Sequence, residues 1–212
     1  AFFYKIKFPF TVGYGMTECA PLISYDHHYE FVPTSCGSVL AGIMEARIDS
    51  PDPENVPGEI QVRGENVMKG YYKNPEATKA AFTKDGWLKT GDSGIMRGRR
   101  LFIKGRIKTM ILGPSGQNIY PEEIEAKLNN LPYVAESLVV ERENKLVALV
   151  YPDFAALEAG GLTTAQLPQI MDDNKGVLNK QVANYERISS LIIVEKEFEK
   201  TPKKSIKRFL YN

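Results

Sequence analysis

Alternating apolar and polar residues predict short β-strands in the first half of the chain. The segment GEIQVRG, residues 58–64, places Ile60 and Val62 on one face and polar residues, Gln61 among them, on the other. Such alternation is typical of a half-buried strand. The segment FPFTVGYG predicts another strand over residues 8–12, which runs into a glycine turn.

One short helix interrupts these strands. In NPEATKAAF, residues 74–82, Asn74 is the expected N-cap and Pro75 the first helical residue. RRLFIKG, residues 99–105, predicts a final strand. Several short strands with one helix predict a small antiparallel region, either β-barrel-like or a sandwich.

The pattern changes after residue 105. YPEEIEAKLNNL predicts an amphipathic helix over 120–131, and two apolar strands form a hairpin that turns at residues 143–144. A helical stretch over 164–184 and a strand over 189–196 follow. The chain is therefore expected to be α+β, with a compact α+β part after the barrel-like region.

We expect two domains, residues 1–105 and 106–212. The change of pattern falls in the segment GRIK, residues 105–108, which we expect to connect them. Limited contact across an exposed connector is typical of a domain boundary.

Composition narrows the function classes. The 212 residues carry 27 basic and 26 acidic side chains, so nucleic acid is not an expected partner. Cys19 and Cys36 make no disulfide framework, which favours a reducing, cytoplasmic setting. No apolar run approaches the roughly 20 residues that span a bilayer. The start lacks Met, and we expect the chain to be an excised part of a longer protein.

Taken singly, the candidate motifs have ordinary structural interpretations. GYGMTE would be a strand-to-helix turn capped by Thr17, and Asp92 in KTGDSG would be an Asx-turn residue. The basic segments KGRIK and TPKKSIKR would be solvated, and the aromatic residues of MKGYY, 68–72, would pack in the core.

Their order along the chain adds more. Tyr-Gly-x-Thr-Glu, then Thr-Gly-Asp, then Gly-Arg-x-Lys, then a lysine-rich terminus after Thr-Pro closely resembles the AMP-forming acyl-CoA synthetases and other adenylate-forming enzymes. The stretch GPSGQNIYPEEIE is most similar to long-chain fatty acid ligases. The resemblance implies that residues 1–105 end a large domain and that 106–212 form a small, mobile C-terminal domain.

The resemblance also implies a nucleotide and metal site in the first motif. Tyr14 would pack against adenine, and Gly15 and Met16 would contact the nucleotide in the same turn. Thr17 would donate its hydroxyl to the α-phosphate. Glu18 would hold Mg²⁺, a hard cation that prefers carboxylate and phosphate oxygens.

Four further positions take roles by the same resemblance. Asp92 would accept hydrogen bonds from the ribose hydroxyls, with Arg106 as a cationic donor nearby. Lys108 would be the hinge between the two domains. Gly116, in GPSGQN, would belong to the loop that closes over the pantetheine arm of CoA.

Two features depart from the family pattern. The glycine- and Ser/Thr-rich phosphate loop of the family has no equivalent in this chain. Relatives also carry a catalytic lysine directly before a hydrophobic-x-Arg group, where Ser205 stands here, and Lys203 and Lys204 precede it. We expect Lys204 to take the catalytic role, with a solvated basic tail as the alternative.

The expected parent enzyme is a fatty acid–CoA ligase. It would use ATP and Mg²⁺ to convert a long-chain fatty acid into an acyl-adenylate and then transfer the acyl group to CoA, releasing AMP and pyrophosphate. Its partners would be these small molecules, the missing N-terminal part of its own chain and, peripherally, a membrane. The alternatives are an adenylation module that feeds a carrier protein and a non-catalytic binding module.

Overall fold

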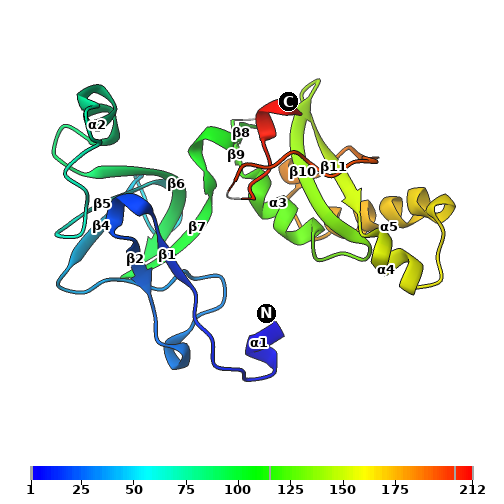
Figure 1. The fold of residues 1–212 in the computed structure, drawn as a ribbon, viewed down its shortest axis with the longest axis horizontal. Coiled ribbons are helices and arrows are strands. Elements are labelled where there is room, and N and C mark those ends of the chain that lie inside the picture. Colours follow the sequence, from blue (N-terminus) through cyan, green and yellow to red (C-terminus); the bar gives the residue numbers. More distant parts are fainter. Residues whose placement is uncertain (1, 115, 203, 212) are drawn as a thin grey trace. The chain divides into compact units, whose positions relative to one another are not determined.

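The computed structural model describes residues 2–114, 116–202 and 204–211. The chain divides into two compact units, residues 1–108 and 109–212. Figure 1 shows their elements, and each unit is described by itself. Both mix helices with mainly antiparallel sheets, which confirms the α+β class.

Unit 1 is built on a seven-stranded antiparallel sheet with the order β1-β2-β3-β7-β6-β5-β4. The order ends at β1 and β4, so the sheet is open and the barrel-like closure expected from the sequence is wrong. The strands are β1 (Gly13–Gly15), β2 (Leu22–Tyr25), β3 (Ser38–Val39), β4 (Met44–Asp49), β5 (Gly58–Gly64), β6 (Leu88–Arg97) and β7 (Arg100–Arg106), and the α-helices are α1 (Phe2–Lys5) and α2 (Pro75–Ala81).

Of the strands predicted for this sheet, one is wrong and another is confirmed. Pairing begins at Gly13, so the strand expected over residues 8–12 is wrong. The strand β5 is confirmed, with Ile60 and Val62 fully buried, but Gln61 on the other face is buried as well. Its amide oxygen accepts a hydrogen bond from Arg47 Nε at 2.8 Å, which satisfies the buried polar group.

The helix α2 forms as the sequence predicts. Asn74 Oδ1 accepts a hydrogen bond from the backbone N–H of Ala77 at 3.0 Å, and Pro75 begins the helix. The cap satisfies one backbone donor that has no partner within the helix.

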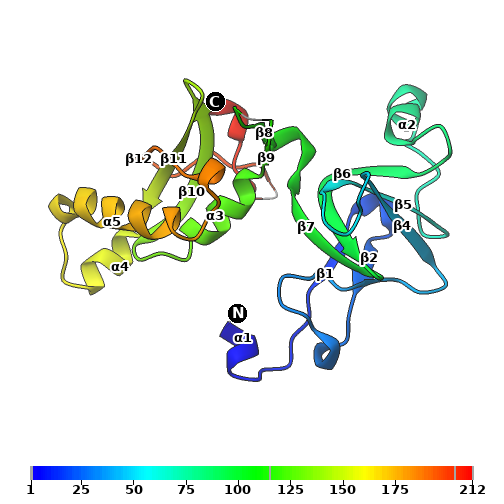
Figure 2. The same cartoon turned by 180° about the vertical axis from the view of Figure 1, so that it is seen from behind.

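Unit 2 contains a three-stranded sheet of order β10-β11-β12 and a two-stranded ribbon of β8 and β9. Figures 1 and 2 show the long β10–β11 hairpin with α3 and α5 beside it. The strands are β8 (Ile111–Leu112), β9 (Asn118–Ile119), β10 (Val134–Arg142), β11 (Lys145–Pro152) and β12 (Ser190–Ile193), and the α-helices are α3 (Pro121–Leu128), α4 (Phe154–Ala159) and α5 (Leu167–Asn179).

Both faces of this sheet are buried. Val139, Ala148 and Val150 pack with α3 and α5 in one cluster. Leu138 and Leu149, on the opposite face, pack against the C-terminal segment in another cluster, with Phe198, Ile206 and Tyr211. Because each strand is covered on both sides, its sequence is continuously apolar and does not alternate.

The predicted hairpin turn is confirmed at Glu143 and Asn144, whose φ angles are 51° and 59°. Two consecutive positive φ values match the twist of a two-residue hairpin loop. The strand expected over 189–196 is confirmed but is shorter, Ser190–Ile193, and it runs parallel to β11. The helix expected over 164–184 is shorter, Leu167–Asn179, and is flanked by 3-10 turns.

A buried carboxylate connects three parts of unit 2. Glu125 on α3 accepts a hydrogen bond from the backbone N–H of Val139 at 2.7 Å and another from Arg208 Nη2. Arg208 Nη1 also donates to the Val139 carbonyl oxygen at 3.2 Å. The C-terminal segment is thereby fixed to both α3 and β10. None of the helices in the described part of the chain is long and apolar enough to span a membrane.

Glu125 should make the stability of the chain depend on pH. Burial raises the pKa of Glu125 and outweighs the opposing effects of Arg208 and the Val139 amide. The folded chain holds the Glu125 proton more tightly than the unfolded chain does, because the folded-state pKa lies above the ordinary 4.5. The stability that comes from this protonation is therefore fully present below pH 4.5 and is lost as the pH rises through the folded-state pKa. The free energy of unfolding of the wild type, relative to Glu125→Gln, should therefore fall from mildly acidic pH to neutrality. Urea unfolding of both chains across this range measures it, and a difference that rises with pH would contradict it.

Candidate functional site

The carboxylate of Asp92 is the centre of a cluster in unit 1. Its Oδ2 accepts a hydrogen bond from the Tyr14 hydroxyl at 2.7 Å, and its Oδ1 lies 3.2 Å from Arg106 Nε. Asp92 and Arg106 are direct partners in the β6–β7 ladder, and Tyr14 lies at the middle of β1. The structure thus brings together three residues that are 78 and 14 positions apart along the chain, Tyr14, Asp92 and Arg106.

The Thr-Gly-Asp sequence fixes the backbone before this carboxylate. Thr90 Oγ1 donates to the Ile60 carbonyl oxygen at 2.7 Å and accepts from the Asp92 N–H at 3.1 Å. Gly91 between them has φ +73°, a conformation that glycine adopts without strain. The interpretation of Asp92 as a simple turn residue is therefore wrong, because the residue lies within β6 and it is Thr90 that accepts the local hydrogen bond.

Tyr14 is mostly covered by its own unit. Only 8% of it is exposed, and its ring belongs to the apolar core with Ile23 and Leu101. Burial, followed by the charge of Asp92, raises the pKa of Tyr14 well above its usual value. The hydroxyl therefore stays protonated and donates to Asp92 at every ordinary pH. The pairing with Asp92 was not foreseen from the sequence, and packing against adenine stays a prediction.

The GYGMTE turn is a 3-10 turn, η1 (Thr17–Cys19), after β1. Thr17 makes no capping hydrogen bond, since the N-cap residue is Met16, so the capping expected of Thr17 is wrong. The Thr17 side chain is exposed and accessible to a ligand. Gly15 is required because a Cβ there would lie 2.2 Å from the Pro21 carbonyl oxygen.

Glu18 suits a magnesium ion that also contacts phosphate. Among the described residues, no three His, Cys, Asp or Glu side chains gather into a group that could hold a metal. Mg²⁺ commonly binds through one or two carboxylates together with substrate phosphates and water. The single, half-buried carboxylate of Glu18 fits this kind of site, with a nucleotide supplying the remaining oxygens.

The aromatic residues of MKGYY do not pack in the core. Tyr71 is 41% exposed and Tyr72 is 88% exposed, which corrects the expectation from the sequence. Tyr71 donates its hydroxyl to Glu18 Oε1 at 2.9 Å. The sequence did not predict this contact, because the two residues are 53 positions apart. No local pattern connects a tyrosine that follows glycine with a turn so far away.

In unit 2, Gly116 lies in the tight loop between β8 and β9. Gly116 N–H donates to the Gly113 carbonyl, and Gly113 N–H donates to the Gln117 carbonyl, both at 2.8 Å. Gly116 has φ +82°, and a Cβ there would meet nothing within 4 Å. The loop therefore presents backbone with open space beside it, as passage of a ligand arm requires. Ser115 of the same loop lies outside the described residues.

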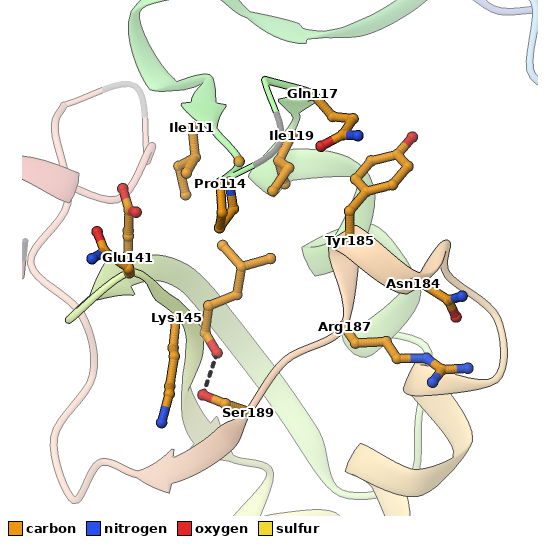
Figure 3. Close-up of a pocket in the computed structure, with 13 residues that line it drawn as sticks. Ile111, Pro114, Gln117, Ile119, Glu141, Lys145, Asn184, Tyr185, Arg187 and Ser189 are labelled. Carbon is orange, nitrogen blue, oxygen red and sulfur yellow. Dashed lines mark hydrogen bonds between the residues drawn. The ribbon is translucent and has the colours of Figure 1, made fainter.

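This loop borders a pocket of about 280 Å³ in unit 2. Figure 3 shows Ile111, Pro114 and Ile119 on its apolar side and the Tyr185 ring beside Gln117. Lys145 and Arg187 line the rim, with side chains that extend away from the centre in this view. An apolar floor with an aromatic ring and cations at the rim suits a ligand that combines a flat ring with negative charge.

Lys204 lies at the tip of a C-terminal turn. Its N–H donates to the Thr201 carbonyl and the Thr201 N–H donates to the Ser205 carbonyl, both at 2.8 Å. Lys204 has φ +60°, a left-handed conformation in which lysine is uncommon. Its side chain is exposed and available to a ligand, as is Ser205. Lys203, the other lysine before Ser205, lies outside the described residues.

Comparison with known proteins identifies the family of the chain. Residues 1–72 match the AMP-binding enzyme family. The chain is 35% identical over 205 residues to 4-coumarate:CoA ligase 1 of Petunia hybrida, covering 90% of this chain and 36% of that protein. It is 33% identical over 205 residues to 4-coumarate–CoA ligase 1 of Glycine max, covering 90% of this chain and 68% of that protein. The chain thus spans about a third of the length of most of these relatives.

Solved structures give the same family. ATP-bound MatB from Rhodopseudomonas palustris matches 94% of this chain and 39% of its own, with TM-score 0.73 and 28% identity. The o-succinylbenzoate CoA synthetase MenE from Bacillus subtilis, in complex with its acyl-adenylate intermediate, matches 99% of this chain and 42% of its own, with TM-score 0.78 and 26% identity. The same enzyme was also solved with ATP and a magnesium ion.

The names of these relatives specify 4-coumarate and other acids, so specificity for a long-chain fatty acid stays a prediction. The chain and these relatives share the broader enzyme family. The match to 4-coumarate–CoA ligase 1 of Glycine max over 90% of this chain and 68% of that protein, together with the common fold, establishes that the chain belongs to the AMP-binding, adenylate-forming enzyme family.

Proposed function

We propose that this chain is the adenosine- and CoA-facing part of an AMP-forming carboxylic acid–CoA ligase. The observation that carries the proposal is Asp92, whose two oxygens are held by Tyr14 in β1 and by Arg106, its partner in the β6–β7 ladder. A carboxylate in a fixed orientation is suited to accept two hydrogen bonds from adjacent ribose hydroxyls. Relatives solved with ATP or an acyl-adenylate support this assignment.

The first half-reaction joins the acid to AMP. A carboxylate oxygen of the acid attacks the α-phosphorus of ATP, and pyrophosphate leaves with the electrons of the broken P–O bond. Thr17 donates to the α-phosphate, and Glu18 holds the Mg²⁺ that offsets phosphate charge. Such catalysis consists mostly of orientation and charge stabilisation.

The second half-reaction transfers the acyl group. The thiol of CoA attacks the acyl carbon, AMP leaves, and a thioester forms with loss of the thiol proton. We assign the Gly116 loop to the pantetheine arm and the adjoining pocket to another part of CoA. The aromatic ring of Tyr185 and the cations Lys145 and Arg187 at the rim support this, since CoA carries an adenine ring and phosphates.

Between the two half-reactions, the small C-terminal domain would rotate about a hinge at Lys108. This residue is the last of unit 1 and lies in η3 (Ile107–Thr109), a single short turn between the two compact units. A hinge absorbs a backbone change at a few positions that end an element.

Two acids are candidates for the substrate. The stretch GPSGQNIYPEEIE favours a long-chain fatty acid, whereas the curated relatives are named for 4-coumarate. The longer protein that contains this chain should catalyse acid-dependent exchange of pyrophosphate into ATP, followed by thioester formation with CoA. A panel of fatty and aromatic acids distinguishes the two candidates. Absence of exchange with every acid would contradict the ligase assignment.

Asp92→Asn should weaken adenosine binding by the 212-residue chain. We expect AMP to bind the wild type only at about millimolar concentration, because no phosphate loop accompanies the adenosine contacts. Loss of a charged acceptor should raise the dissociation constant roughly 10-fold. NMR titration with AMP measures both values, and Asp85→Asn, an exposed acid of the same unit, is the matched control. Equal affinities for the wild type and Asp92→Asn would count against the ribose contact.

Lys204→Gly tests the C-terminal lysine in the longer protein. The substitution removes the ammonium and leaves a residue that favours φ +60°, so the turn should stay folded. If Lys204 donates to the transition state, the pyrophosphate exchange rate should fall by about 10²-fold. Thioester formation from supplied acyl-adenylate should stay near the wild-type rate. Lys207→Gln, which loses only a surface contact with Glu199, is the control, and equal exchange rates in all three proteins would make the tail structural.

A further inference from the structure

We propose that Tyr71 is a positioning residue that orients the carboxylate of Glu18 for its cation. The inference rests on the proposed function, in which Glu18 holds Mg²⁺. Its basis is the 2.9 Å hydrogen bond from the Tyr71 hydroxyl to Glu18 Oε1, between two segments that are 53 residues apart. With Oε1 engaged, Oε2 is the oxygen that remains for a cation.

The backbone around Tyr71 is fixed by the start of α2. Tyr71 N–H donates to Thr78 Oγ1 at 2.9 Å, and Thr78 Oγ1 donates to the Asn74 carbonyl at 2.8 Å. Gly70 has φ +151°, and a Cβ there would lie 2.6 Å from Thr78 Cγ2. The glycine therefore allows the chain to approach α2 closely, and the helix determines where the tyrosine lies.

The backbone around Glu18 is held by the same segment. Met68 N–H donates to the Glu18 carbonyl oxygen at 2.7 Å. Asn66 Nδ2 donates to the Cys19 carbonyl at 2.7 Å and to the Leu22 carbonyl at 2.9 Å. Residues 66–71 thus fix the main chain at two points of the turn and at the start of β2, and they fix the acidic side chain at one point.

This arrangement is what a metal-binding carboxylate needs. A glutamate on an exposed turn has several rotamers, and a partner on one oxygen selects an orientation for the other. Groups that hydrogen-bond to a metal ligand orient it and commonly change metal affinity by 10-fold or more. The hydrogen bond to the Glu18 carboxylate, followed by partial burial and the charge of Glu18, raises the pKa of Tyr71, so the hydroxyl remains a donor at physiological pH.

The test uses Mn²⁺ with ATP as a paramagnetic probe for the 212-residue chain. In the wild type, backbone NMR signals of residues 17–19 should broaden as the Mn²⁺–ATP complex is added, and Mg²⁺–ATP should leave them sharp. Tyr71→Phe, which removes one hydroxyl from a partly exposed ring, should require roughly 5-fold more Mn²⁺–ATP for the same broadening. Tyr72→Phe, the neighbouring exposed tyrosine, should match the wild type and is the control.

A second measurement checks the contact without any metal. Glu18→Gln should lower the pKa of the Tyr71 phenol toward its ordinary value of 10.0, because the hydrogen bond to a carboxylate that mainly raises this pKa is replaced by one to a neutral amide. Equal broadening in the wild type and Tyr71→Phe would overturn the positioning role while leaving the proposed ligase function intact. No broadening near Glu18 in the wild type, with AMP still binding at Asp92, would overturn both the metal role of Glu18 and this inference.

Discussion

Unit 1 depends on one carboxylate that satisfies two partners at once. Asp92 is buried, and a buried carboxylate is costly unless its oxygens are paired. Tyr14 on β1 and Arg106 on β7 supply these partners, so the edge strand and the centre of the sheet meet at this residue. The same pairing leaves the carboxylate in one orientation, which is the geometry that the proposed contact with ribose requires.

Unit 2 also contains a buried carboxylate with two partners, and here it joins distant parts of the chain. Glu125 joins α3, the backbone of β10 and Arg208 near the C-terminus. Replacing such an ion pair by well-packed apolar residues is often neutral, whereas removing one partner is strongly destabilising. Arg208 follows the turn at Lys204 in the chain. Its contacts with Glu125 and Val139 therefore anchor the C-terminal end of that turn.

The sequence predicted features that depend on neighbouring residues. The Asn74 cap, the turn at Glu143 and Asn144 and the stripe of α3 were all found, since each results from local backbone geometry. The open sheet and the position of β1 were missed because strand pairing depends on partners far along the chain. Tyr71 was assigned to the core for the same reason, as exposure depends on which distant turn lies beside it.

In the candidate site, too, the sequence predicted local features and missed contacts between distant residues. The order of the motifs made Tyr14, Glu18, Asp92 and Arg106 candidates, but it did not predict the contacts of Asp92 with Tyr14 and Arg106 or that of Glu18 with Tyr71. Lys204 illustrates why contacts matter more than residue type. Its φ of +60° gives the backbone of the turn the conformation that glycine favours, and this geometry, not the side chain, determines where Ser205 lies. Lysine in this conformation costs about 1 kcal/mol or more relative to glycine, and Lys73 adopts it as well, with φ 52°, so the conformation alone assigns no role to the Lys204 side chain.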